Sequence, residues 1–296
     1  MNAIDISLSF QKSLKPKLIE EKIDYYFYRR VAHLMVPIFY RLKFTPNQVT
    51  SLSLLSGLFA CYSVYHFHFV AATLYGIFAI CLDCSDGQLA RLTGQSSPIG
   101  RAMDGLFDLI WIALFWLSIQ WSHYFPIHGF DHLIWFMIAG GASMILHCWR
   151  FDGVRIQYFK LTNPKQAEKD LDLPTAMALM KSEFQKWHFF SAALGFCIVF
   201  HLTFFVNKKK KNTSLQLSQG RQDQIKTILD PEIVRWPWLG ESIHNTLVLL
   251  GTFIAVWTPY GLILAIGLIA IPMNLYWIYC ELKWHTAVRQ AQRIIS

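Results

Sequence analysis

The chain has 296 residues, of which 54% are hydrophobic, 16% are aromatic and only 16% are charged, and its mean hydropathy is +0.31. These values are shifted from those of soluble domains toward those of proteins that lie in lipid. The formal net charge of +8 does not indicate nucleic acid, because membrane proteins collect Lys and Arg in their cytoplasmic loops. We therefore expect an integral membrane protein that binds no nucleic acid.

The first distinctive segment is residues 23–44, which mixes aromatic side chains with four basic ones: Arg29, Arg30, Arg41 and Lys43. This composition is typical of an amphipathic helix that lies in the membrane interface with its basic groups toward anionic headgroups. Thr45 and Pro46 then predict a helix start, because threonine can cap free backbone amides and proline suits the first helical position.

Several apolar runs have the length that a helix needs to cross about 30 Å of hydrocarbon. They predict spans near 48–66, 69–91, 100–121, 132–149, 244–257 and 261–280. A further apolar stretch, 189–206, is also long enough to cross. If it stays at the cytoplasmic face, every basic cluster lies on one side, as the positive-inside rule favours. We therefore predict an all-α fold of six transmembrane helices preceded by an interfacial amphipathic helix.

This pattern divides the chain into four predicted parts. They are a cytoplasmic N-terminus with the interfacial helix (1–44), the first four membrane helices (45–150), a cytoplasmic or interfacial insertion (151–243), and the last two membrane helices with a basic tail (244–296). Within the fourth span, the small residues Gly140 to Ser143 allow close approach of another backbone. This patch predicts packing on another helix or on a second copy of the chain.

Four carboxylates stand between the second and third predicted spans, in D-C-S-D-G-Q-L-A-R, eight further residues, and G-R-A-M-D-G-L-F-D. They are Asp83, Asp86, Asp104 and Asp108. A lone aspartate at mid-membrane costs about 2.5 to 3.5 kcal/mol even on the mildest scale. Such residues are therefore retained mainly where they face a polar cavity and serve a function.

The spacing of the aspartates predicts that they converge. Asp83 and Asp86 share one helix face, as do Asp104 and Asp108, because residues three or four apart are neighbours on a helix. Two antiparallel helices place the two pairs at similar depth. Four such charges repel each other unless a cation lies between them. Oxygen-only ligands select hard metals, so we expect Mg²⁺ or Mn²⁺, with a pair of ions as one arrangement.

Residues beside the aspartates suit a phosphate-containing ligand. Gly87, Ala90 and Gly100 lack large side chains, which lets a nucleotide approach the backbone closely. Arg91 can bind phosphate oxygens through two parallel hydrogen bonds. Hard metals held by carboxylates are the usual apparatus of phosphoryl chemistry, so the motif predicts transfer of a phosphate-containing group.

The full pattern D-x2-D-G-x2-A-R-x8-G-x3-D-x3-D resembles the signature of the CDP-alcohol phosphotransferases, and every position is present. The resemblance extends to the interfacial helix, to T-P-N-Q-V-T at 45–50, and to the six-span plan. It implies an enzyme of phospholipid synthesis that transfers a phosphatidyl or phospho-alcohol group from a CDP-linked donor, such as CDP-diacylglycerol, to an alcohol acceptor with release of CMP. The signature does not identify the acceptor.

The resemblance also implies roles for individual residues. Asp83, Asp86 and Asp104 are implied metal ligands, and Asp108 is the implied general base, which also touches a metal. The implied neighbours of the CDP moiety are Asn47, Thr50, Gly87, Ala90, Arg91 and Gly100. We further expect the active site on the cytoplasmic side, anionic membrane lipids as partners, and a homodimer, the last from the small-residue patch and the habit of the family.

Two other function classes also use intramembrane aspartates. A divalent-cation transporter or channel would explain the carboxylates, but not the Gly, Ala and Arg at fixed spacing. An intramembrane aspartyl protease needs only one aspartate on each of two helices, and its usual G-x-G-D is absent from this sequence.

Overall fold

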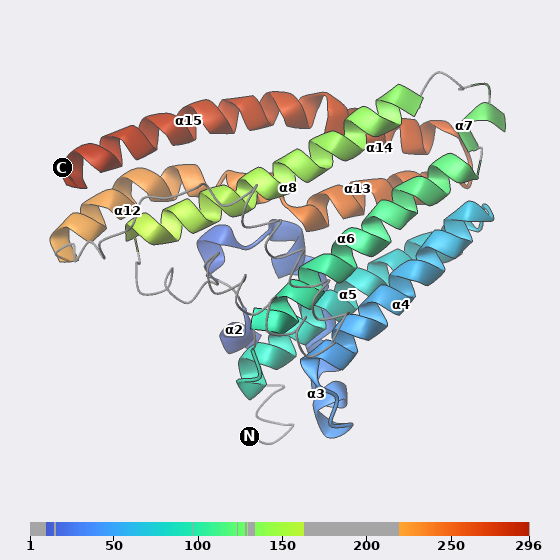
Figure 1. Ribbon diagram of the computed structural model, residues 1–296, viewed down its shortest axis with the longest axis horizontal. Helices are drawn as coiled ribbons and strands as arrows, with labels where there is room; N and C mark the ends of the chain where they lie inside the picture. Colours follow the sequence, from blue (N-terminus) through green and yellow to red (C-terminus); the bar gives the residue numbers. More distant parts are fainter. Residues whose placement is uncertain are drawn as a thin grey trace, which may run out of the picture. The chain divides into compact units, whose positions relative to one another are not determined.

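The computed structural model describes residues 10–14, 16–96, 98–122, 124–127, 129, 134–162 and 219–295. Within these ranges the chain is mostly helical and contains no strand, which confirms the predicted all-α class. The fold consists of two compact units, one formed by 1–144 with 241–273 and the other by 145–240 with 274–296. Figure 1 gives the helix labels used below.

The first unit contains most of the motif-bearing helices. Its elements are α2 (Phe10–Ser13), the 3-10 turn η1 (Lys17–Ile19), the π-helical segment η2 (Asp24–Tyr28), α3 (Arg29–Arg41), α4 (Pro46–Tyr65), α5 (Phe69–Thr93), α6 (Pro98–Trp121), α7 (Tyr124–Ile127), the beginning of α8 (Ile134–Thr162), α13 (Glu241–Ile254) and α14 (Tyr260–Ala270). The second unit contains the rest of α8, α12 (Gln219–Ile233), the 3-10 turn η4 (Trp236–Leu239) and nearly all of α15 (Pro272–Ile295).

The start of α4 is fixed by a capping box. The Thr45 hydroxyl accepts a hydrogen bond from the Gln48 amide at 3.4 Å, and the Gln48 side chain accepts one from the Thr45 amide at 2.9 Å. Pro46 occupies the first helical position, where its missing N–H leaves no bond unmade. The predicted helix start is therefore confirmed.

Helix α4 lies beside both α5 and α6 (Figure 1). Its serines attach it to α5: Ser53 donates to the Ala79 carbonyl at 2.9 Å, and Ser56 donates to the Tyr75 carbonyl at 2.8 Å. On the side of α6, a Cβ at Gly57 would lie only 2.5 Å from Cγ of Trp111. The absence of a side chain at this position lets α4 and the Trp111 ring pack in direct contact.

We expect Gly57→Ala to lower the free energy of unfolding by about 1 to 3 kcal/mol, the usual cost of an added group in a packed interior. The matched control is Gly105→Ala on α6, where an added Cβ would meet no atom within 4 Å. Thermal unfolding in detergent measures both variants. Equal midpoints for the two would show that α4 and α6 do not pack as closely as described.

Helix α3 packs one face against α5 and the start of α4. Val36 and Phe39 form a buried cluster with Val49, Leu82 and Leu89. The opposite face of α3 exposes Leu34, Ile38 and Leu42. A helix is thus present within the predicted segment 23–44, while its amphipathic character and its location in the membrane interface stay predictions.

Within the described ranges, four helical stretches are long and apolar enough to cross a membrane: α5, residues Met103–Trp121 of α6, α8, and Tyr260–Ile294. They fit an integral membrane protein. Helix α4 is rich in serine, and α13 has only 14 residues, fewer than the roughly 20 of a usual span. The predicted count of six spans therefore stays a prediction, and residues 189–206 lie outside the described part of the chain.

The last predicted span, 261–280, lies inside the candidate span Tyr260–Ile294, and its helix is interrupted once, at Ile271. Helix α14 ends at Ala270 and α15 begins at Pro272. Proline has no amide hydrogen, and its ring disfavours helical geometry at the preceding residue. Helix α14 still forms the expected hairpin with α13, because a Cβ at Gly251 would lie 2.8 Å from the Gly261 carbonyl oxygen.

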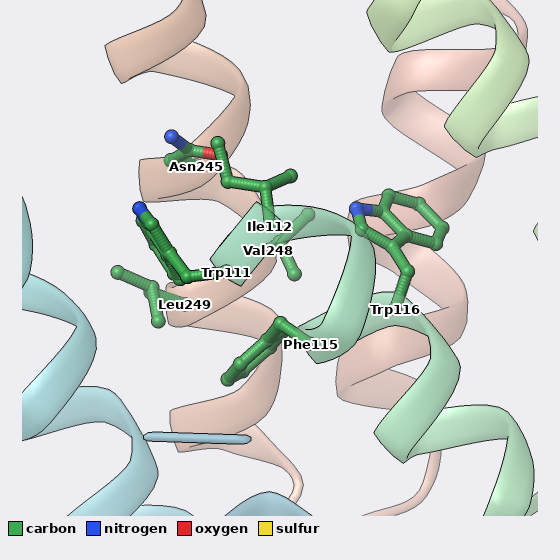
Figure 2. Close-up of a pocket in the computed structure, with 7 residues that line it drawn as sticks. All are labelled: Trp111, Ile112, Phe115, Trp116, Asn245, Val248 and Leu249. Carbon is green, nitrogen blue, oxygen red and sulfur yellow. The ribbon is translucent and has the colours of Figure 1, made fainter. Parts of the chain in front are cut away.

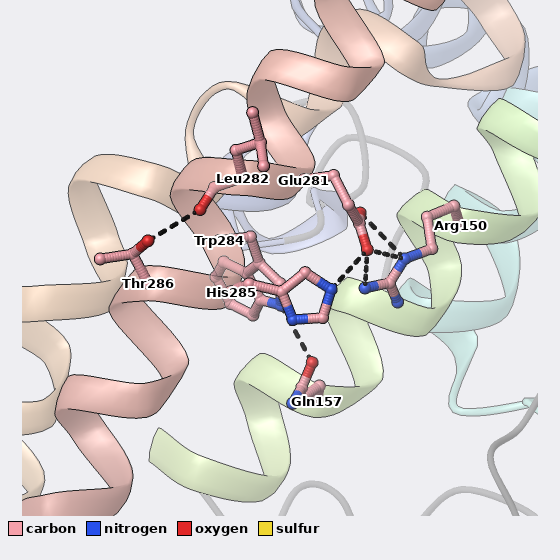
Figure 3. A network of polar contacts seen from close by, with 7 residues as sticks. All are labelled: Arg150, Gln157, Glu281, Leu282, Trp284, His285 and Thr286. Carbon is pink, nitrogen blue, oxygen red and sulfur yellow. Dashed lines mark hydrogen bonds and ion pairs between the residues drawn. The ribbon is translucent and has the colours of Figure 1, made fainter.

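The helix that contains the fourth predicted span continues past residue 149 and ends at Thr162. Its charged end is helical because the second unit provides partners for it. Glu281 of α15 accepts hydrogen bonds from Arg150 Nε at 2.9 Å and Nη2 at 2.6 Å, and the Trp284 indole donates to the Gln157 side chain at 2.9 Å (Figure 3). Tyr158 donates to Asp230 of α12 at 2.7 Å.

The predicted insertion 151–243 therefore begins within α8 and includes α12 near its end. Residues 163–218, including Lys208 to Lys211, lie outside the described part of the chain. The four predicted parts of the chain stay a prediction.

The small-residue patch of α8 packs inside the chain. A Cβ at Gly140 would lie 2.7 Å from Ile266 of α14 and 3.4 Å from the Trp116 ring of α6. Gly141 faces the same ring at 3.8 Å. The sequence predicted that this patch packs either on another helix or on a second copy of the chain. The contacts with α14 and α6 are packing on other helices of the same chain. The patch therefore no longer argues for a homodimer.

Candidate active site

The two halves of the aspartate motif are on α5 and α6. Helix α5 ends at Gly94, which has a φ of 71° and donates its amide to the Ala90 carbonyl. This left-handed conformation is open to glycine at little cost and ends the helix just after Arg91. The chain can then enter α6 within a few residues, which brings the second pair of aspartates back toward the first.

Three of the aspartates converge. Asp83, Asp104 and Asp108 each offer an oxygen atom within 4.8 Å of the others, and all three side chains are half-buried. In the described part of the chain, no Lys, Arg or His forms an ion pair with any of them. Asp104 Oδ1 is buried and has no hydrogen-bond partner among the described residues. The cluster therefore combines concentrated negative charge with an unsatisfied acceptor.

Asp86 lies beside this cluster without belonging to the group of three. It is 3% exposed, and its Oδ2 accepts a hydrogen bond of 2.5 Å from the Thr50 hydroxyl. On α5 it stands three residues after Asp83, so the two share a helix face. Thr50, which the family signature implied as a neighbour of CDP, thus contacts an aspartate. The role of Asp86 as a metal ligand stays a prediction.

Asp108 has a partner that the sequence reasoning missed. The Trp111 indole donates to Asp108 Oδ1 at 3.3 Å, and the ring itself is 3% exposed. A tryptophan in an apolar run is usually explained by membrane packing, yet Trp111 stands three residues after Asp108, so the two share a helix face. This three-residue spacing is the feature of the sequence that indicates a contact between Trp111 and Asp108.

Trp111 also lines a small pocket between α6 and α13 (Figure 2). Apolar and aromatic side chains form most of the pocket wall, and Asn245 adds a side-chain amide to it. Asn245 is 6% exposed. It is a second residue that the sequence analysis passed over, although an asparagine in an apolar run is a signal of a polar requirement.

The remaining predicted substrate residues lie around the ends of these helices. Gly87 and Arg91 are in contact, since a Cβ at Gly87 would lie 3.4 Å from Arg91 Nη1. Arg91 is exposed, and Ala90 and Gly100 are half-buried. Asn47 is exposed in the first turn of α4. Their contact with a CDP moiety stays a prediction.

Comparison with protein families decides the class of this site. The CDP-alcohol phosphatidyltransferase family model matches residues 43–180. The chain contains a CDP-alcohol phosphatidyltransferase domain. This domain includes α4, α5, α6 and α8 with all four aspartates, and it confirms the family indicated by the signature. Searches of curated proteins and of solved structures find no match.

The family domain supports a transferase of phosphate-containing groups in phospholipid synthesis, and this family is typically dependent on divalent metal. The residues present fit such an ion. Carboxylate oxygens are the ligands that Mg²⁺ and Mn²⁺ prefer, and among the described residues no basic side chain forms an ion pair with the cluster. The unpartnered oxygen of Asp104 supports the same conclusion.

Proposed function

We propose that this protein transfers a phosphatidyl or phospho-alcohol group from a CDP-linked donor to an alcohol acceptor and releases CMP, using Mg²⁺ or Mn²⁺, as one ion or a pair. The observation that supports it best is the convergence of Asp83, Asp104 and Asp108 within the family domain. Asp83, Asp104 and Asp108 would hold the metal, with Asp86 at its edge. When bound, the metal neutralises charge on the diphosphate and on the aspartates.

Side chains of the protein accept the proton, orient the base and bind the donor phosphates. The acceptor oxygen forms a bond to the phosphorus that bears the lipid or alcohol, the bond from that phosphorus to the CMP oxygen breaks, and the hydroxyl proton passes to Asp108. The Trp111 indole, which donates to Asp108 Oδ1, holds that carboxylate in one orientation. Arg91 binds phosphate oxygens of the donor through its terminal nitrogens.

The orientation in the membrane and the partners are part of the same proposal. We place the aspartate site on the cytoplasmic side, because Arg91 and Arg101 flank the turn between α5 and α6 and basic residues favour that side. Anionic lipids of that leaflet are the expected neighbours of the basic segments. A homodimer rests on the habit of the family alone.

The experiment that tests the function uses purified protein in lipid vesicles with CDP-diacylglycerol, CDP-choline or CDP-ethanolamine as donor. Each donor is combined with a panel of glycerol phosphate, inositol, inositol phosphate, serine and diacylglycerol. We expect one pairing to yield CMP and a new phospholipid in equal amounts. Transport of Mn²⁺ into the vesicles without release of CMP from any donor would favour the cation transporter instead.

A further inference from the structure

The segment from Phe10 to Arg29 precedes the family-matched range, yet it contacts the motif helix directly. Arg91 donates its Nε hydrogen to the main-chain carbonyl of Ser13 at 2.5 Å. Ser13 is fully buried, and its hydroxyl closes the turn of α2 by donating to the Phe10 carbonyl at 2.6 Å. A motif residue is therefore held by a part of the chain that the family pattern does not include.

The bond to Ser13 uses only the Nε–H group of the Arg91 guanidinium. Nη1 and Nη2 lie 3.4 and 3.5 Å from the place that a Cβ on Gly87 would occupy, and the Arg91 side chain is exposed. With Nε bonded to a carbonyl and the guanidinium group lying against Gly87, the terminal nitrogens have a defined direction. Such pre-orientation lowers the entropy lost when a phosphate binds.

A second set of contacts fixes the segment on α5. Gln88 is fully buried and donates its side-chain amide to the Arg29 carbonyl at 2.9 Å. The Arg29 guanidinium is itself buried, where it pairs with Glu20 and lies 3.9 Å from Asp24. A buried ion pair holds its geometry strongly, because breaking it leaves an uncompensated charge in the interior.

The same segment is also attached to α13. Glu21 accepts a hydrogen bond of 3.2 Å from the Ile243 amide, in the first turn of that helix. The Tyr28 hydroxyl lies 2.8 Å from Thr246 Oγ1. Thr246 donates to the Ser242 carbonyl, so Tyr28 is the donor of the pair.

We propose that residues 10–29 form a positioning element that orients Arg91 toward the diphosphate of the donor. This inference rests on the proposed function and adds a determinant of donor affinity from outside the family-matched domain. Hydrogen bonds to both α5 and α13 attach the segment that carries Ser13 to the helices around the site. Loosening the segment should therefore weaken donor binding and leave the chemical step nearly unchanged.

The test loosens α2 in the full-length protein through Phe10→Ala, because the Phe10 ring packs on His33 at 5.1 Å and on Tyr25 at 6.4 Å. We expect KM for the CDP-linked donor and Kd for CDP, measured by calorimetry, to rise about tenfold, since one hydrogen bond to a charged group is at stake. We expect kcat to stay within about twofold, because a contact equal in ground and transition states changes KM alone. The control is Leu18→Ala, an exposed position of the same segment.

A double-mutant cycle separates positioning from a structural effect. Lysine has no Nε–H to place against Ser13, so in an Arg91→Lys background Phe10→Ala should leave Kd for CDP unchanged. Equal effects of Phe10→Ala in both backgrounds, or no effect in wild type, would overturn the proposal. If Phe10→Ala does not fold, Ser13→Ala, which removes only the hydroxyl bond of the α2 turn, takes its place with a smaller rise. Wild-type protein that releases no CMP would refute the proposed function instead.

Discussion

Asp108→Asn is expected to lower the rate of CMP release by about 10² to 10⁴-fold, the usual contribution of a positioned general base. An amide cannot take the proton of the acceptor hydroxyl, whereas it can still accept the hydrogen bond that Trp111 donates to this position. In the proposed site, Asp83 and Asp104 remain available to hold the metal, and Arg91 remains available to bind the donor. Donor binding should therefore stay close to that of the wild type.

The measurement for Asp108→Asn pairs CMP release with equilibrium binding of CDP, and thermal stability in detergent confirms that the variant folds. Trp111→Phe serves as a comparison, because it keeps an aromatic ring against Gly57 and removes the indole donor. We expect it to lose less turnover than Asp108→Asn. Near-normal turnover of Asp108→Asn would place the base elsewhere, and a full loss of CDP binding would make Asp108 chiefly a metal ligand.

Asp83→Asn is expected to reduce nucleotide affinity and turnover together. A neutral amide offers one carbonyl oxygen without charge, so the site loses affinity for its cation. The loss should exceed the roughly 10- to 100-fold that typically follows removal of a group that only supports a ligand. Asp104→Asn should behave alike, because the two carboxylates belong to the same group of three.

Thermal unfolding gives the Asp83 prediction a readout that is independent of activity. Mg²⁺ at 100 times its Kd should stabilise the wild type by about 2.7 kcal/mol. The same concentration should stabilise Asp83→Asn by much less. Without metal, the variant should be at least as stable as the wild type, since one of several repelling charges is gone. Equal stabilisation of both proteins by Mg²⁺ would show that Asp83 is not a ligand.

Local features of this chain were predictable because short-range chemistry determines them. The capping box at Thr45 and the shared faces of the aspartate pairs follow from spacing along one helix. The convergence of Asp83 with Asp104 and Asp108 followed from two antiparallel helices joined by a short turn. These are the features that carry the chemistry, so the class of the site could be read from the sequence.

Features that depend on distant parts of the chain were missed. Helix α8 continues past the membrane-like run because Glu281, more than 100 positions later, pairs with Arg150. Nothing near Arg91 in the sequence indicates that the Ser13 carbonyl is its partner, 78 positions earlier. By contrast, the break at Pro272 was a local signal that the apolar pattern on both sides obscured.

If the aspartates of α5 and α6 support metal-dependent transfer from a CDP-linked donor, the reaction needs a divalent ion. This is tested by measuring CMP release by the purified protein in lipid, before EDTA, after EDTA, and after Mg²⁺ or Mn²⁺ is restored in excess. We expect EDTA to abolish release and either metal to restore it. Full CMP release in EDTA would contradict this expectation.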